Sequence, residues 1–241
     1  MALDSAIHPF NLSIPQSALD DLQTRLRLAR WPDKETVSDW SQGTPLLAIQ
    51  NLCLHWQTRY DWRRCEALLN SYPQFTTNIH GVEIYFLHIR SRHENTLPMC
   101  ITHGWPGSVL EFRHVVEKLV DPQAHGGEAH GGEAHDAFHL VIPALPGYAF
   151  SGKPAETSWG IERTARAWAE LMRRLGYADA ERGWVAQGGD WGSHVTVSLG
   201  HQVPEGLRGV HLNSVYFETK VWIKDWDHDS LASFVGEREA G

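Results

Sequence analysis

Gly188-Gly189-Asp190-Trp191-Gly192 is the stretch that decides the fold of this chain. An apolar run, Trp184-Val185-Ala186, precedes it, and a segment with helical character, residues 193–199, follows it. A strand that turns sharply into a helix, with glycines two positions either side of the central residue, has the form of a nucleophile elbow. The pattern predicts that Asp190 sits on a strained turn and presents its carboxylate there.

An aspartate at the centre of such a turn narrows the chemistry. A carboxylate is already ionised at neutral pH, so it needs no base to become a nucleophile. Its attack on an sp³ carbon leaves an ester that water can hydrolyse, whereas a serine would leave an ether. Asp190 therefore suits substrates that react at an alkyl carbon, namely epoxides or alkyl halides. The alternative is a structural role, because Asp is a good helix N-cap and Asp190 precedes a helix.

The composition indicates one core of ordinary size and excludes several partner classes. The 241 residues are 42% hydrophobic, and the net charge of −8 comes without a basic cluster. We therefore expect neither nucleic acid nor an anionic membrane surface as a partner. No run reaches the ~20 apolar residues of a spanning helix. Three cysteines without metal-binding spacing, and a start without a signal-peptide pattern, predict a cytoplasmic protein.

Residues 1–74 are expected to form an N-terminal helical arm. One helix is expected after Ser13-Ile14-Pro15, a second from Pro45, and a third over residues 61–72, which Pro73 ends. We expect this arm to pack on the main domain, because several tryptophans add apolar surface that must be covered. These are Trp31, Trp40, Trp56 and Trp62.

Residues 75–241 are expected to form an α/β core. Helices are expected over residues 109–120, where Ser108 and Glu111 have capping-box spacing, and over residues 160–175. Alternation of strands and helices predicts a mostly parallel sheet. The expected strands are residues 75–79, 82–89, 99–102, 138–142, 184–186 and 207–212.

A tandem repeat interrupts this core. His125-Gly-Gly-Glu-Ala is followed by His130-Gly-Gly-Glu-Ala and then by His135. A histidine at every fifth position could suggest metal binding, but the glycines remove any fixed ligand geometry. We interpret the repeat as a surface insertion and expect no metal site.

A second loop could supply a backbone hydrogen-bond donor for the hydrolysis of an ester at Asp190. Its hydrolysis passes through a tetrahedral oxyanion, which requires fixed hydrogen-bond donors. The N–H of Trp191, directly after the nucleophile, is one candidate, and the N–H of Trp105 in His103-Gly104-Trp105-Pro106 is the other. Gly and Pro also mark plain turns. However, this loop follows the third expected strand and the elbow follows the fifth, which is the order that the mechanism requires.

Taken together, these segments resemble the epoxide hydrolases of the microsomal type, α/β-hydrolase enzymes with a distinctive N-terminal arm. The resemblance covers residues 10–213 apart from the histidine repeat, and its most specific part is HGWPGS (103–108) paired with QGGDWG (187–192). It implies Asp190 as nucleophile, Trp105 and Trp191 as backbone oxyanion donors, and hydrolysis of a small-molecule epoxide to a vicinal diol. It also implies a role in detoxification without a cofactor. The other matching segments are Tyr60-Asp61-Trp62-Arg63, residues 72–77, residues 84–91 and Leu145-Pro146-Gly147-Tyr148.

The resemblance also implies parts that this chain does not supply. The family activates water with a His–carboxylate pair that follows the nucleophile, and it polarises the epoxide with lid tyrosines. The sequence offers six of eight expected strands, so we expect the last strands and most of the lid to be missing and turnover to be incomplete. We expect His194 to pack against its surroundings and His228 not to act as the base. Tyr216 matches no lid tyrosine. An unpaired sheet edge favours aggregation or a homodimer.

Two other functions are consistent with the same residues. A haloalkane dehalogenase would use the same aspartate chemistry, with the tryptophans beside Asp190 cradling a halide ion. A non-catalytic remnant that acts as a binding module would explain the missing base. The sequence of the N-terminal arm favours the epoxide hydrolase.

Overall fold

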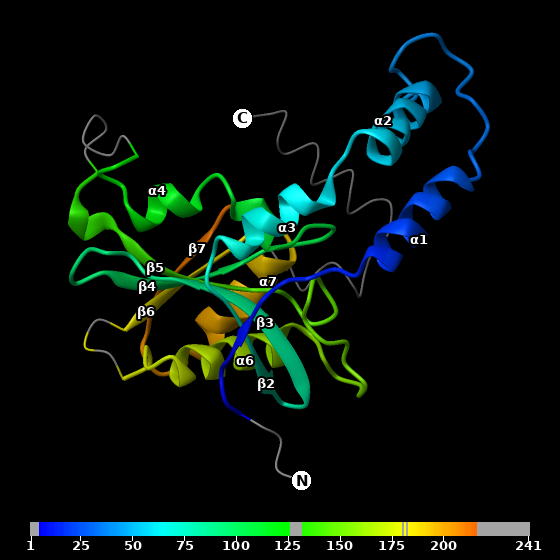
Figure 1. The fold of residues 1–241 in the computed structure, drawn as a ribbon. Coiled ribbons are helices and arrows are strands. Elements are labelled where there is room, and N and C mark those ends of the chain that lie inside the picture. The colour runs from blue at the N-terminus through cyan, green and yellow to red at the C-terminus, as the bar shows by residue number, and fades with distance from the viewer. Residues whose placement is uncertain (1–4, 126–131, 180, 182, 216–241) are drawn as a thin grey trace, which may run out of the picture.

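The computed structural model describes residues 5–125, 132–179, 181 and 183–215 (Figure 1). These residues form a seven-stranded sheet in the order β1-β2-β3-β5-β4-β6-β7. Its strands are β1 (His8–Phe10), β2 (Gln74–Ile79), β3 (Val82–Ile89), β4 (Leu97–Thr102), β5 (Phe138–Pro143), β6 (Trp184–Gly188) and β7 (Leu207–Leu212). The α-helices are α1 (Gln16–Arg27), α2 (Leu46–Thr58), α3 (Trp62–Asn70), α4 (Val116–Val120), α6 (Ile161–Arg174) and α7 (Trp191–Gln202), and the 3₁₀ turns are η1 (Val109–Phe112) and η2 (Ala134–Asp136).

The sheet is mixed, and its parallel half holds the elbow. Strands β5, β4, β6 and β7 pair parallel with one another, whereas the β1–β2, β2–β3 and β3–β5 pairs are antiparallel. The β2–β3 hairpin turns at His80 and Gly81, whose positive φ angles of 51° and 86° suit a tight two-residue connection. Because parallel strands end at one edge of a sheet, the loops after β4 and β6 meet there.

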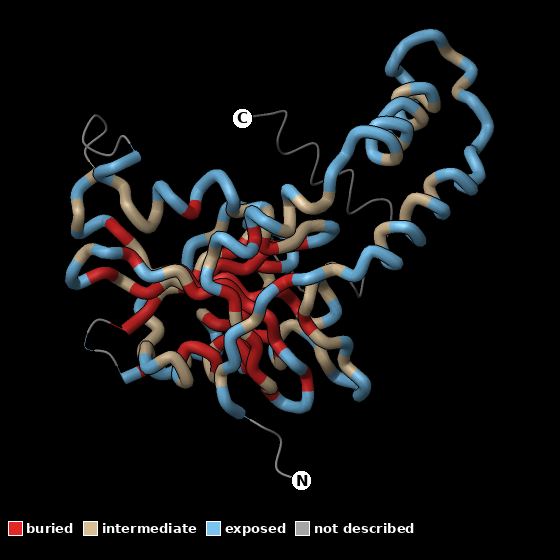
Figure 2. Tube along the Cα trace, viewed as in Figure 1, coloured by how far each residue is buried: buried red, intermediate tan, exposed pale blue. Residues whose placement is uncertain are grey.

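Helices cover both faces of the sheet (Figures 1 and 2). Alternate residues of β3 point to opposite faces, so Ile84 and Phe86 join one core cluster while Tyr85 and Leu87 join the other. The first cluster includes Trp168 of α6 and residues of α7, and the second includes residues of α3, η1 and α4. Two buried layers thus hold the strand ends in place.

The expectation that the whole N-terminal arm packs on the core was wrong for α1 and α2. Neither helix contains a buried residue, and both project away from the sheet (Figure 2). Within the described part of the arm, β1, the segment around Leu12 and α3 pack on the core, and the Asn70 side chain binds the backbone N–H and C=O of Leu12 at 2.9 and 2.8 Å. The spacing of apolar residues in α1 and α2 predicts helices but does not tell whether another element covers those residues.

The helix expected over residues 109–120 was also wrong as a continuous element. The structure has the 3₁₀ turn η1 and the short helix α4, separated by three residues. Ser108 caps the turn by accepting a hydrogen bond from the Leu110 N–H at 3.3 Å. Neighbouring β-branched residues, Val115 and Val116, lower the helix propensity where the element breaks.

Strand β1 was not predicted, because three residues with a central proline carry no strand pattern. The segment after β7 that contains Tyr216 and His228 lies outside the described residues, as does His130 of the histidine repeat. Within the described part, no helix has both the length and the apolar character needed to cross a bilayer.

Candidate active site

Asp190 occupies a strained turn between β6 and α7. Its φ of 51° and ψ of −124° lie outside the regions that non-glycine residues favour. The side chain makes no capping hydrogen bond to α7, and only the backbone oxygen accepts one, from the Ser193 N–H at 2.9 Å. The capping role that the sequence left open therefore does not explain this aspartate, whose side chain is exposed.

The glycines around Asp190 permit three segments to approach closely. A Cβ on Gly188 would overlap the carbonyl oxygen of Gly192, and a Cβ on Gly192 would overlap the carbonyl oxygen of Thr102 at the end of β4. The turn is further held by the Ser193 hydroxyl, which donates to the Gly188 oxygen at 2.9 Å. Only small residues fit at positions 188 and 192, as the sequence pattern predicts.

The loop after β4 reaches the elbow across 85 positions of sequence. The Trp105 N–H donates to Asp190 Oδ1 at 2.6 Å. This N–H and, to a lesser degree, that of Trp191 hold the pKa of Asp190 below its ordinary value. The structure thus brings together Asp190, Trp105 and Trp191. The loop containing residues 103–108 is called the HGWPGS loop below.

One peptide unit of the HGWPGS loop is fixed at its oxygen end. The Gly104 oxygen accepts hydrogen bonds from the Gly107 N–H and from His103 Nδ1, both at 3.0 Å. The other nitrogen of His103, Nε2, accepts from the Leu145 N–H at 3.1 Å, so the ring carries its proton on Nδ1. Burial lowers the pKa of His103 and keeps this neutral form. The N–H at the opposite end of the same peptide belongs to Trp105 and points at Asp190.

Sequence reasoning missed this part played by His103. The residue precedes the glycine of HGWPGS, but nothing in its spacing shows that both ring nitrogens bind backbone groups. Gly104 is required here for space, because a Cβ at that position would overlap the Asp190 carboxylate. The only sequence signal is therefore the His-Gly pair at the end of a buried strand.

Three described histidines follow the elbow in the sequence, namely His194, His201 and His211. The His194 ring packs against the Trp191 ring with centroids 5.5 Å apart, which agrees with the packing role expected for it. Its charge is the weakest of the influences that lower the pKa of Asp190, after the Trp105 and Trp191 N–H groups. His201 and His211 are exposed.

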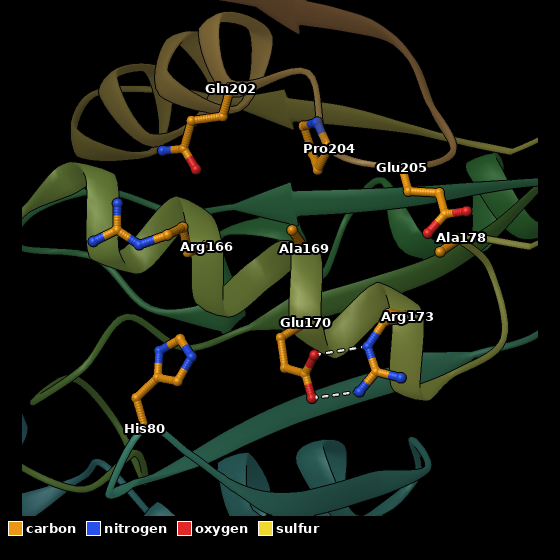
Figure 3. A pocket seen from close by; sticks show the side chains of 9 residues that line it. All are labelled: His80, Arg166, Ala169, Glu170, Arg173, Ala178, Gln202, Pro204 and Glu205. Carbon is orange, nitrogen blue, oxygen red and sulfur yellow. Dashed lines mark hydrogen bonds and ion pairs between the residues drawn. The ribbon is translucent and has the colours of Figure 1, made fainter.

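The described residues hold no group of three or more His, Cys, Asp or Glu side chains suited to a metal ion. An open depression of about 400 Å³ lies between α6, the β2–β3 turn and the end of α7 (Figure 3). Glu170 and Arg173 form an ion pair within it at 2.8 Å, and its lining includes His80 and Gln202. None of the three candidate site residues lines this depression, so it is separate from the elbow.

Comparison with known proteins identifies relatives of this chain. The family described as "Epoxide hydrolase N terminus" matches residues 7–112. A protein of Stigmatella aurantiaca (strain DW4/3-1) that is provisionally named an epoxide hydrolase is 56% identical over 207 residues. Epoxide hydrolase 1 of Oryctolagus cuniculus is 32% identical over 242 residues. The solved structure of the Aspergillus niger epoxide hydrolase superimposes with a TM-score of 0.75 at 33% identity, which confirms the expected α/β-hydrolase fold.

The match extends over most of this chain and about half of each relative. The match to the Stigmatella protein covers 86% of this chain and 45% of that protein. The match to the Oryctolagus cuniculus protein covers 99% of this chain and 50% of that protein. For the Aspergillus structure the shares are 95% and 57%. The chain therefore spans about half the length of the relatives it matches.

Proposed function

Because this chain belongs to the family of epoxide hydrolases that share this N-terminal domain, we propose that it carries the nucleophile and the oxyanion donors of an epoxide-opening site. Asp190 is the nucleophile, and the backbone N–H groups of Trp105 and Trp191 are the donors. The observation that supports this most strongly is the 2.6 Å hydrogen bond from the Trp105 N–H to Asp190 Oδ1. It joins the two loops that the mechanism requires.

The first step uses the two carboxylate oxygens differently. Oδ1 is occupied by the Trp105 N–H, so Oδ2 is the oxygen that attacks an epoxide carbon. A bond forms between Oδ2 and carbon while the epoxide C–O bond breaks, and its electron pair stays on the departing oxygen, which takes up a proton. The product is a β-hydroxyalkyl ester of Asp190. The exposed position of the side chain leaves it open to a small-molecule epoxide.

In the second step, the N–H groups of Trp105 and Trp191 stabilise the oxyanion that forms when the ester is hydrolysed. Attack of water on the ester carbonyl places a negative charge on the oxygen that was Oδ1. The Trp105 N–H already donates to that atom, and the Trp191 N–H acts on the same carboxyl group, so the two donors stabilise the charge without reorganisation. Collapse of this intermediate releases the vicinal diol and restores the carboxylate. No cofactor takes part in either step.

We expect the 241-residue chain by itself to stop at the ester. Water must lose a proton to attack, and an imidazole in reach of the ester usually accepts it. His103 already uses both ring nitrogens for backbone groups, and His194 packs against Trp191. We therefore expect neither of these two histidines to activate water at the ester carbonyl.

The proposal also includes the setting of the reaction. We assign the chain to the cytoplasm and to the detoxification of epoxides, in the form of a polypeptide that can pair as a homodimer. The division into an arm, residues 1–74, and a core, residues 75–241, remains part of the same proposal. The lack of a basic cluster in the sequence supports the absence of nucleic acid as a partner.

Intact-mass spectrometry after exposure to styrene oxide tests the proposal. We expect one adduct per chain, no adduct on the Asp190→Ala variant, and no accumulation of diol beyond one equivalent. Repeated turnover to diol would refute the stall at the ester, and an unlabelled native chain would favour a non-catalytic binding module. Release of halide from a 1-haloalkane without reaction with the epoxide would instead identify a dehalogenase.

A further inference from the structure

A second carboxylate, that of Glu111, lies against the HGWPGS loop. Its position is defined by Gly107, because a Cβ on that glycine would overlap Glu111 Oε1. The backbone N–H groups of Gly104 and Ser108 face the same carboxylate and act to lower its pKa. Glu111 therefore contacts the loop at Gly107 and interacts with N–H groups on each side of Trp105.

These contacts complement the hydrogen bonds already described for the loop. His103 and the Gly107 N–H hold the oxygen of the peptide between Gly104 and Trp105. Glu111 packs against Gly107, which supplies one of those two donors, and its charge attracts the Gly104 N–H on the other side of the Gly104 α-carbon. Rotation about that α-carbon is what would swing the Trp105 N–H away from Asp190. The contacts of Glu111 thus oppose the motion that would open the hydrogen bond to the nucleophile.

The surroundings of Glu111 disfavour the ionised form of its side chain. Desolvation raises the pKa of Glu111, and the negative charge of Asp190 raises it further. The Gly104 and Ser108 N–H groups act in the opposite direction. Glu111 is an exposed residue, yet its carboxylate lies against Gly107 instead of turning into solvent, away from the charge of Asp190.

We propose that Glu111 is a positioning residue for the nucleophile, which it serves by fixing the HGWPGS loop so that the Trp105 N–H stays directed at Asp190 Oδ1. The inference rests on the proposed function of Asp190 for its effect on reactivity, but its effect on the loop can be measured without any chemistry. Glu111 takes no part in the bond-making steps. Sequence reasoning assigned it only a capping-box role.

The reactivity test compares three variants under saturating styrene oxide. For Glu111→Ala we expect the maximal rate of alkylation to fall by about ten- to a hundredfold, because small misplacement of a reacting group has effects of this size. The half-saturating epoxide concentration should change less than twofold. Glu111→Gln keeps one acceptor oxygen for one of the two N–H groups, so its rate should lie between those of the native chain and the alanine variant.

The matched control is Glu117→Ala, an exposed glutamate on α4 whose carboxylate faces His125 at 3.5 Å. It should react at the native rate. Native-rate alkylation of Glu111→Ala, or a change in half-saturation alone, would overturn the inference. A loss of rate in Glu117→Ala equal to that in Glu111→Ala would also overturn it.

Amide hydrogen exchange provides the readout that does not depend on reaction. We expect faster exchange in the peptide covering residues 103–108 of Glu111→Ala, with unchanged exchange in β4 and β6 as proof of folding, and native exchange in Glu117→Ala. Unchanged exchange in the loop would overturn the inference. If the native chain is not alkylated but the loop exchanges faster in Glu111→Ala, the proposed chemistry fails while the positioning role stands.

Discussion

At the scale of single residues, the site is a carboxylate whose geometry is fixed before any substrate arrives. The positive φ of Asp190 brings its side chain out of the turn, and the Trp105 N–H binds one of its two oxygens. Such preorganised donors act without the reorganisation that water would need. The reactivity of Asp190 should therefore depend on the loop opposite it as much as on the elbow itself.

The depressed pKa of Asp190 predicts the pH dependence of alkylation. Donation by Trp105 and Trp191 favours the charged form, so the proposed nucleophile remains ionised below the ordinary carboxyl pKa of 3.8. We expect the rate of ester formation to be independent of pH from neutral to about pH 5 and to fall only at more acidic values. The rate of ester formation at each pH can be measured from intact-mass time courses. A rate that fell with a midpoint near that of an ordinary histidine would contradict the assignment of a self-sufficient carboxylate.

Gly104 predicts a steric effect on the nucleophile. An alanine there would place its Cβ on the Asp190 carboxylate and push it off the Trp105 N–H, so alkylation should fall by about a hundredfold. The matched control is Gly200→Ala in α7, whose Cβ would lie 3.7 Å from Val210, an ordinary contact. That variant should react normally and gain up to about 1 kcal/mol in the free energy of unfolding. Equal alkylation of both variants would show that the carboxylate is not confined by the loop.

Some residues of the candidate site could be predicted from the sequence and others could not. Asp190, Trp105 and Trp191 could be found because a carboxylate between glycines, and a Gly-Pro loop after an earlier strand, are local patterns with a known order. His103 and Glu111 could not be found as loop restraints. Their partners are backbone atoms, and backbone hydrogen bonds leave no trace in residue type or spacing.

At the scale of helices and strands, prediction succeeded where one pattern extends over a whole element. Strand β3 and helix α6 were both predicted, with bounds within one residue of those observed. It failed over residues 109–120, where the pattern is helical but β-branched residues break the backbone into η1 and α4. It also failed for β1, which exists only because β2 offers it an edge.

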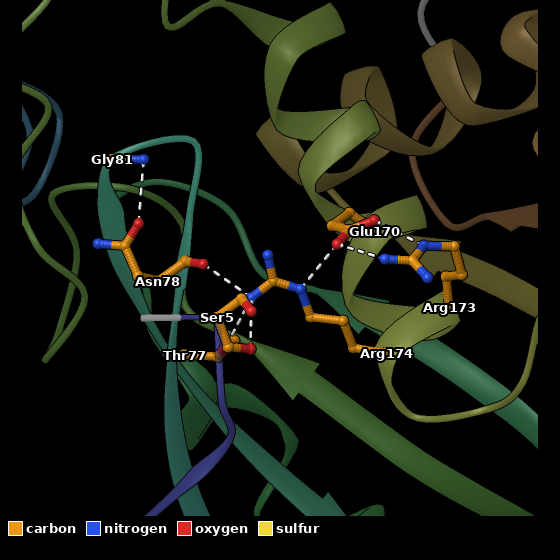
Figure 4. Close-up of polar contacts among 7 residues, drawn as sticks. All are labelled: Ser5, Thr77, Asn78, Gly81, Glu170, Arg173 and Arg174. Atoms are coloured by element: carbon orange, nitrogen blue, oxygen red, sulfur yellow. Dashed lines mark hydrogen bonds and ion pairs between the residues drawn. The ribbon is translucent and has the colours of Figure 1, made fainter. Parts of the chain in front are cut away.

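An arginine of helix α6, Arg174, binds the N-terminal segment (Figure 4). Arg174 donates to the oxygen of Ser5 at 3.0 Å and to Thr77 Oγ1 and the Asn78 oxygen, each at 2.7 Å. It also binds Glu170 at 2.7 Å, and Arg173 binds the same carboxylate. Glu170 therefore orients the arginine that connects α6 to β2.

This network predicts an acid-dependent part of the stability. Hydrogen bonds from Arg173 lower the pKa of Glu170 from 4.5 to about 2, with Arg174 adding to the effect. A depressed folded-state pKa stabilises the fold above the unfolded value, and the contribution disappears as the pH falls from about 4.5 towards 2. Because the Glu170 side chain is 24% exposed, we expect a contribution of about 2 kcal/mol.

Urea unfolding at pH 7 and pH 3 measures that contribution. Glu170→Gln should lower the free energy of unfolding at pH 7 by about 2 kcal/mol and reduce the difference between the two pH values. Glu117→Gln, an exposed glutamate on α4, should change neither quantity appreciably. An unaltered pH dependence in Glu170→Gln would show that solvent screens the pair.

At the scale of the whole molecule, a buried sheet carries two exposed apolar features. Helices α1 and α2 project from the core, and α2 exposes Leu47 and Leu52 at 64% and 61%. Strand β7 forms one edge of the sheet, with Val210 exposed on it. Exposed apolar helices and open strand edges are the surfaces through which chains associate.

The chain is therefore expected to associate with itself as its concentration rises. Sedimentation velocity over a concentration series measures this. A lysine at the edge, Val210→Lys, should weaken an association through β7, and Leu52→Glu should weaken one through α2. If association occurs mainly through β7, Val210→Lys should raise the concentration at which the chain associates by at least about tenfold. A native chain that stays monomeric throughout would contradict the prediction.

The overall arrangement explains why the order of motifs was informative. Two loops 85 residues apart follow neighbouring parallel strands, β4 and β6, so their ends must meet at one edge of the sheet. The sequence predicted this meeting because strand order and parallel pairing constrain it. It could not predict the projection of α1 and α2, because that depends on which surfaces are covered rather than on local pattern.

The most direct test of the central claim is to locate the ester by peptide mapping after exposure to styrene oxide. We predict that the adduct is found on the peptide containing residues 188–192, that fragmentation places it on Asp190, and that mild alkaline hydrolysis releases it. An adduct confined to cysteine or histidine side chains, with Asp190 unmodified, would contradict the account.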